Sequence, residues 1–155
     1  MFADVYFEDF QTGQKCTSSG RQITEADVRL LFGMVGGTHP LHIDPIYCAS
    51  RPDVGRPIAP GSLILGVVEG FFTKDVCPDH HVFSQPAGYR KIRFLKPIYL
   101  DDVVCAVFEV CGREKEDGFS GEVLFHISVY NQKQEIVTYM EELFRVEKRE
   151  KGEAD

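Results

Sequence analysis

The segment that most constrains the fold is "GSLILGVVEGFF", residues 61–72, which is apolar on every side. A helix with apolar residues all round has to be buried in the interior of a protein. Gly66 and Gly70 are poor helix formers, and we interpret them as points where another backbone approaches closely. The rest of the chain therefore has to supply elements that surround one buried helix.

The second half of the chain shows the alternation of apolar and polar residues that is typical of β-strands. Long strands are expected at residues 88–97, 102–112, 121–130 and 136–146, with a hairpin turn at 131–134. Strands that follow one another closely favour an antiparallel sheet, and the whole pattern predicts an α+β fold. A long sheet wrapped around the apolar helix fits best, because a β-sandwich leaves residues 61–72 without a place.

An earlier helix is expected to begin at Thr24, which forms a capping box with Asp27 three residues later. Apolar residues follow with the spacing of one helix face: Val28, Leu31, Phe32 and Val35. Gly36 and Gly37 end this helix. The stretch "GGTHPLHIDP", residues 36–45, is therefore expected in the loop that follows it.

The chain has 155 residues, which suggests one domain, expected at residues 1–148, followed by a charged and disordered tail at 149–155. A net charge of −7 argues against binding to nucleic acid or to a membrane surface, because both need a basic face. No apolar run is long enough to cross a membrane and the N-terminus does not resemble a signal peptide. Together with five cysteines read as reduced thiols, this predicts a cytoplasmic protein.

Glu69 is the most informative single residue, because it is the only charged residue between Pro57 and Phe72. A carboxylate on an apolar helix would be desolvated, and buried ionisable groups are candidates for catalysis. The alternatives are that Glu69 marks a helix face that reaches the surface, or that it pairs with an arginine.

His42 is a candidate general acid or base, with His39 and Asp44 close to it in the sequence. The alternative is a histidine with a structural role only. A metal site formed by these three side chains is disfavoured, since a further ligand is missing and Pro40 prevents the helical spacing of two histidine ligands. We therefore expect no metal.

Two further features suggest binding of a substrate. Gly61 opens the apolar helix, and its N–H group at the positive helix end could bind a carbonyl oxygen or an oxyanion. A basic cluster could meet phosphate groups, although solvent-facing strand positions explain it equally well. The members of this cluster are Arg90, Lys91, Arg93 and Lys96.

The segments "GGTHPLHIDPIYCA" and "GRPIAPGSLILGVVEGF" together resemble the MaoC-like hydratases and dehydratases, which include the R-specific enoyl-CoA hydratases. The resemblance extends through "FEDFQTGQKCTSSGRQITEADV", "YRKIRFLKPIYLDD" and "VYNQKQEIV", nearly to residue 148. It implies a hotdog fold, in which an antiparallel sheet wraps around a central helix, here residues 61–73. It also implies dimers with sites at the subunit interface, and reversible addition of water across the 2,3 double bond of an acyl thioester.

The family's catalytic residues carry over only in part. The family histidine falls on His42, the family aspartate on Gly37, and the family asparagine on His39. A helix serine of some members falls on Glu69. The turn "RPIAPGSLIL" also resembles the β-hydroxyacyl-carrier-protein dehydratases, whose helix carboxylate falls on Gly66. Both expected carboxylate positions are thus glycines.

The leading hypothesis from the sequence is a MaoC-like hydratase or dehydratase, a lyase that acts on a thioester of CoA or of an acyl carrier protein and needs no other cofactor. His42 would be the acid/base and Glu69 would replace the missing aspartate. Gly61, Gly37, His39 and Arg93 would bind the substrate in a homodimer or a higher homo-oligomer. The alternatives are a thioesterase that uses Glu69 to activate water, and a non-catalytic acyl-CoA-binding protein, which the glycine at position 37 suggests.

Overall fold

A computed structural model describes residues 6–78 and 81–149. One antiparallel sheet has the strand order β1-β4-β5-β6-β3, with β2 also paired to β4. The strands are β1 (Lys15–Thr17), β2 (Arg21–Gln22), β3 (Ser84–Phe94), β4 (Val103–Glu116), β5 (Ser120–Asn131) and β6 (Ile136–Glu147). The helices are η1 (Phe7–Asp9), α1 (Glu25–Val35), η2 (Pro40–His42), α2 (Pro45–Ala49), α3 (Gly61–Phe71) and the π-helical turn η3 (Phe72–Val76).

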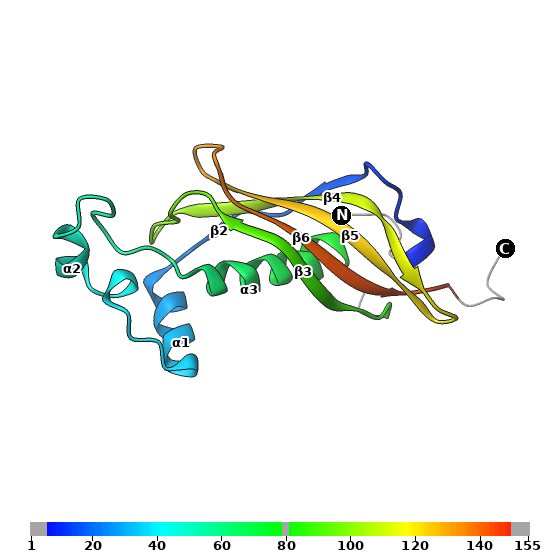
Figure 1. The fold of residues 1–155 in the computed structure, drawn as a ribbon, viewed down its shortest axis with the longest axis horizontal. Coiled ribbons are helices and arrows are strands. Elements are labelled where there is room, and N and C mark those ends of the chain that lie inside the picture. The colour runs from blue at the N-terminus through cyan, green and yellow to red at the C-terminus, as the bar shows by residue number, and fades with distance from the viewer. Residues whose placement is uncertain (1–5, 79–80, 150–155) are drawn as a thin grey trace.

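Helix α3 lies along the curved sheet, while α1 and α2 lie beyond one end of it (Figure 1). The buried residues of α3 are Ile64, Val67, Val68 and Phe71, and they join the main core with the inward side chains of β4, β5 and β6. This confirms the predicted α+β arrangement of an antiparallel sheet around one central helix. The four predicted long strands are also confirmed as β3, β4, β5 and β6. In β4 and β5, the buried residues of the alternating pattern face the core.

A cluster of aromatic rings fixes the C-terminal end of α3 to the sheet. Phe72 stacks on Phe144 of β6, with ring centroids 3.5 Å apart, and meets Phe125 of β5 edge to face at 5.6 Å. All three side chains are fully buried or nearly so. The helix therefore has a fixed position against the sheet, and its N-terminus at Gly61 lies at the end where α1 and α2 are found (Figure 1).

Helix α1 begins and ends as predicted, but its predicted apolar face is only partly buried. The Asp27 N–H donates to the Thr24 hydroxyl and the Asp27 carboxylate accepts from the Thr24 N–H, which completes the capping box. Gly36 ends the helix in the left-handed region, at φ 70°. Val28 is buried but Val35 is 65% exposed, because α1 extends beyond the sheet and has only its first turns against the core.

Strand β3 forms one edge of the sheet, since it pairs with β6 and with no other strand of the described chain. Its side chains are mostly exposed, including the ring of Phe94 at 55%. Two irregularities interrupt its pairing, and at the second Lys91 adopts a positive φ of 50°. An eleven-residue edge strand with unpaired backbone groups is a natural place for a second chain to pair.

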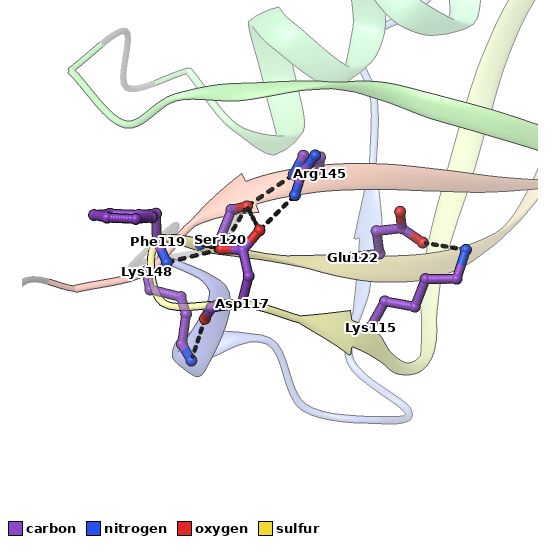
Figure 2. A network of polar contacts seen from close by, with 7 residues as sticks. All are labelled: Lys115, Asp117, Phe119, Ser120, Glu122, Arg145 and Lys148. Carbon is purple, nitrogen blue, oxygen red and sulfur yellow. Dashed lines mark hydrogen bonds and ion pairs between the residues drawn. The ribbon is translucent and has the colours of Figure 1, made fainter.

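The hairpin between β4 and β5 is held by the carboxylate of Asp117 (Figure 2). It accepts hydrogen bonds from the backbone N–H groups of Phe119 and Ser120, both at 2.8 Å, and pairs with Arg145 of β6 at 2.6 Å. These backbone donors and the Arg145 guanidinium lower the pKa of Asp117 to about 2. The carboxylate therefore joins three strands at this hairpin at neutral pH.

The predicted tail at 149–155 lies outside the described residues except for its first member. The guanidinium of Arg149 contacts both carboxylate oxygens of Asp9 in η1, at 2.7 and 2.8 Å. The domain limits stay a prediction. In the described part of the chain, every helix is too short or too polar to cross a membrane.

Candidate active site

The loop after α1 places His42 at the end of the short helix η2 and fixes its neighbours. The Nδ1 atom of His39 accepts from the backbone N–H of Leu41 at 3.2 Å, which caps η2. The carboxylate of Asp44 accepts from the backbone N–H groups of Ile46 and Tyr47, at 2.8 and 3.1 Å, and so caps α2. Asp44 therefore has a local structural role, which is the chemistry expected of an N-cap.

Within residues 6–78 and 81–149, the imidazole of His42 has a polar contact at one nitrogen only. Its Nδ1 lies 2.7 Å from the carbonyl oxygen of Ile58, and a carbonyl can only accept, so we assign the ring proton to Nδ1. The neutral ring then has Nε2 available to take a proton. Phe32 of α1 packs edge to face against the same ring at 5.5 Å. This tautomer suits a general base whose orientation is set by the backbone.

His42 and Gly61 line the same cleft, which has a volume of about 400 Å³. Other lining residues include Ile64 of α3, Phe94 and Lys96 at the end of β3, and Thr138 of β6. Most of the wall is apolar. The hydroxyl of Thr138 is buried and has no hydrogen-bond partner among the described residues. The structure thus brings together the two residues that the sequence proposed as acid/base and as oxygen-binding backbone.

Gly61 is the first residue of α3 and follows Pro60, so its N–H belongs to the first turn, whose N–H groups have no acceptor within the helix. The ring of Phe94 packs against its Cα, and a Cβ at this position would overlap the ring. Only glycine therefore allows Phe94 and the helix N-terminus to form this wall of the cleft.

The resemblance carries the family aspartate onto Gly37, and the space for a side chain at this glycine is already filled. A Cβ on Gly37 would lie 2.8 to 3.0 Å from three ring atoms of Phe32. The same ring contacts His42. An apolar ring next to His42 therefore occupies the place where a carboxylate would begin.

The substitution Gly37→Asp alone is expected to destabilise the protein and to give no gain in hydration, because the Phe32 ring has to move away from His42. A clash of this kind in a packed site typically costs about 1–3 kcal/mol of unfolding free energy. In a Phe32→Ala background, Gly37→Asp is expected to cost less unfolding free energy than it does in the wild type, because the ring that the new side chain would meet is absent. Urea unfolding and enoyl thioester hydration measure the two effects. Full stability of Gly37→Asp alone would contradict the packing argument.

Glu69 is not among the residues that line this cleft. It lies eight residues after Gly61 on α3, which corresponds to about 12 Å along a helix axis. The carboxylate is half-buried and accepts a hydrogen bond from the hydroxyl of Tyr89 on β3. Glu69 has no arginine partner among the described residues and does not face open solvent, and its catalytic role stays a prediction.

Glu142 of β6 is a buried carboxyl group that the sequence reasoning missed. Its exposure is 0%, and neither oxygen has a hydrogen-bond partner that meets normal geometry among the described residues. The pKa of Glu142 is raised to about 8. Burial is the main cause, the hydrogen bond with Tyr89 lowers the pKa, and the nearby charge of Glu69 raises it. The signal was present, because Glu142 shares strand parity with Met140 and Phe144 and so had to face the core.

The predicted basic cluster is largely neutralised within the chain. Three of its four members pair with carboxylates: Arg90 with Glu114 at 3.0 Å, Lys91 with Glu141 at 2.7 Å and Lys96 with Glu135 at 2.7 Å. Arg93 donates to the carbonyl of Ile92 and has no acidic partner in the described part of the chain. Arg93 is therefore the member of the cluster that is available for a phosphate group.

Comparison with known proteins connects this fold to one family. The family model described as a MaoC-like domain matches residues 9–131. A monoamine oxidase regulatory protein from Archaeoglobus fulgidus is 30% identical, with 94% of this chain and 96% of that chain covered and a TM-score of 0.84. A search of curated proteins gave no significant match.

Two R-hydratases share the fold at lower identity. The (R)-hydratase from A. caviae involved in PHA biosynthesis is 23% identical, with 87% of this chain and 96% of that chain covered and a TM-score of 0.73. The R-hydratase PhaJ1 from Pseudomonas aeruginosa is 22% identical, with 97% and 94% covered and a TM-score of 0.77. With a family model that spans most of the chain and a hotdog architecture, this protein belongs to the MaoC-like hydratase/dehydratase family.

Proposed function

We propose that the protein catalyses the reversible hydration of a 2-enoyl thioester, with CoA or an acyl carrier protein as the thiol component. The observation that carries the proposal is the cleft shared by His42 and the N-terminus of α3. An unsaturated thioester in this cleft would meet an N–H donor for its carbonyl oxygen and an imidazole nitrogen for proton transfer. The apolar lining suits the acyl chain.

Each of the two groups has a separate task in this reaction. Hydration places negative charge on the thioester oxygen as the enolate forms, and the Gly61 N–H at the positive end of α3 would stabilise that charge. His42 would exchange a proton through Nε2, with the Nδ1 contact to Ile58 keeping the ring in place. Water addition needs one proton removed from water and one delivered to the α-carbon, so a second proton-transfer group is required.

We assign the second group to Glu69 of a partner subunit in a homodimer, or in a higher assembly of such dimers. Within one chain Glu69 does not reach the His42 cleft, so the partner's helix has to supply it. The exposed edge strand β3 offers backbone groups for pairing with a second copy. Arg93 on the same strand would then contact the phosphates of the carrier, and His39 and the Gly37 backbone would border the entrance.

A non-catalytic acyl-thioester-binding protein is the second candidate, and one observation favours it. The Phe32 ring fills the place of the family carboxylate beside His42, which removes half of the family's proton-transfer machinery. Loss of such a group commonly reduces catalysis by several orders of magnitude. A thioesterase reaction, with Glu69 activating water, is a further outcome that the following experiment separates.

The purified protein would be mixed with a panel of enoyl and saturated acyl thioesters of CoA and of an acyl carrier protein. Loss of the conjugated enoyl absorbance is the expected result and supports hydration. Release of free thiol from a saturated ester would instead indicate a thioesterase. Binding without either change would support the non-catalytic role and overturn the proposed activity.

A further inference from the structure

We infer that Tyr89 and Glu142 are positioning residues for the Glu69 carboxylate, in a line that runs from the buried Glu142 through the Tyr89 hydroxyl to Glu69. This inference deepens the proposed function and rests on the proposed role of Glu69. The three residues come from three elements: β6, β3 and α3. Neither Tyr89 nor Glu142 is part of the cleft that contains His42.

Tyr89 is fixed between the two carboxyl groups by the sheet. It pairs directly with Glu142 across the β3–β6 ladder, and its hydroxyl donates to Oε1 of Glu69 on the helix below. Burial, and next the hydrogen bond to Glu69, raise the pKa of Tyr89. The phenol therefore keeps its proton over the physiological pH range and always acts as a donor toward Glu69.

Glu142 lies behind Tyr89 in an apolar setting. The neighbours with the same parity on β6 are Met140 and Phe144, and Phe125 lies opposite on β5. The titratable groups that face Glu142 are Tyr89 from β3 and Glu69 from α3. With a pKa of about 8, Glu142 is mostly protonated at neutral pH and can donate a hydrogen bond.

These two protonation states fit one arrangement. Tyr89 gives its only proton to Glu69, and the protonated Glu142 carboxyl lies across the ladder from Tyr89 without adding a charge. The line then carries a single negative charge, on Glu69. Oε1 of Glu69 is held while Oε2 has no donor among the described residues, which leaves Oε2 for a reacting water.

The line also predicts the effect of ionising Glu142. A carboxylate at Glu142 would place a second negative charge near Glu69. Activity should therefore fall as pH rises through about 8. The substitution Glu142→Gln keeps the shape of the protonated acid but cannot ionise, so the fall in activity above pH 8 should be absent in this variant.

The test measures kcat and KM for enoyl thioester hydration across this pH range in four variants of the full-length protein. Tyr89→Phe is expected to lower kcat about tenfold with little change in KM, the order expected for one hydrogen bond to a charged group. Glu142→Gln is expected to lose the alkaline decline. Tyr139→Phe is the matched control, because Tyr139 is on β6 and bonds Glu141 on the other face of the sheet. Glu69→Gln tests whether Glu69 itself has a catalytic role.

A second readout does not depend on activity. The folded-state pKa of Glu142 is raised from 4.5 to about 8, so the folded state holds an extra proton between these values. Its contribution to stability is complete below about pH 4.5, decreases as pH rises, and levels off above about pH 8. The melting temperature of Glu142→Gln minus that of the wild type should therefore increase as pH rises from about 4.5 to about 8.

Two outcomes would overturn the inference, and they differ from failure of the proposed function. If Glu69→Gln abolishes hydration while Tyr89→Phe leaves kcat and its pH profile unchanged, the line has no positioning role. If the melting temperatures of the wild type and Glu142→Gln change in parallel from pH 5 to about pH 9, the Glu142 carboxyl does not hold an extra proton in the folded state. Unchanged activity in Glu69→Gln would instead refute the proposed role of Glu69.

Discussion

Replacing His42 with alanine is expected to lower kcat/KM for enoyl thioester hydration by about 100- to 10,000-fold, the usual contribution of a general acid or base. The imidazole is oriented by the Ile58 carbonyl and has Nε2 available in the cleft, and no other histidine lines that cleft in the described part of the chain. The initial rate of absorbance loss with an enoyl-CoA ester measures the effect.

His126→Ala is the matched control for this substitution. His126 lies on the outer face of the sheet, where its Nε2 contacts Glu141 at 3.1 Å, so its loss should leave hydration unchanged. A His42→Ala protein that keeps more than about one tenth of the wild-type rate would rule out His42 as the acid/base, since this is far less than such a group contributes.

Replacing Gly61 with alanine is expected to reduce kcat about 100-fold or more, the range measured when one oxyanion donor is lost. The added Cβ would meet the Phe94 ring, so either the ring or the first turn of α3 must move, and the N–H would no longer point to the same place. Overpacking of this kind also costs about 1–3 kcal/mol of unfolding free energy. Steady-state kinetics and urea unfolding separate the two effects.

Gly33→Ala provides the control, because Gly33 is an exposed helical glycine of α1 and a Cβ there has nothing within 4 Å. This variant should keep its activity and gain up to about 1 kcal/mol of stability, since alanine is a better helix former than glycine. An active Gly61→Ala protein with a normal kcat would show that the thioester oxygen is bound elsewhere.

Most of the fold could be predicted from the sequence because burial imposes regular periods on it. The all-apolar segment at 61–72 had to be a buried helix, and strands β4 and β5 alternate since one face of each packs on the core. Strands β1 and β2 were missed, because two or three residues are too few to show an alternation. The exposure of Val35 was also not foreseen, since it depends on how far α1 extends past the sheet.

The candidate site was predictable only where one residue type has a distinctive chemistry. His42 and Gly61 were singled out for separate roles, and the structure places both in the lining of one cleft, while those roles stay predictions. Phe32 was taken as a simple helix-face residue, yet its ring both contacts His42 and fills the space beside Gly37. Three members of the basic cluster proved to be paired, because their acidic partners come from distant strands.

The sequence by itself determined the family, the central helix and the loop that carries His42, because each depends on residues that are close in the chain. The tertiary structure alone decided which carboxyl groups lie close to one another. Glu69 and Glu142 are 73 positions apart, and they become coupled only because β3 places Tyr89 between them. Desolvation and like-charge repulsion depend on three-dimensional distance, so the raised pKa of Glu142 appears only once the sheet has closed over the helix.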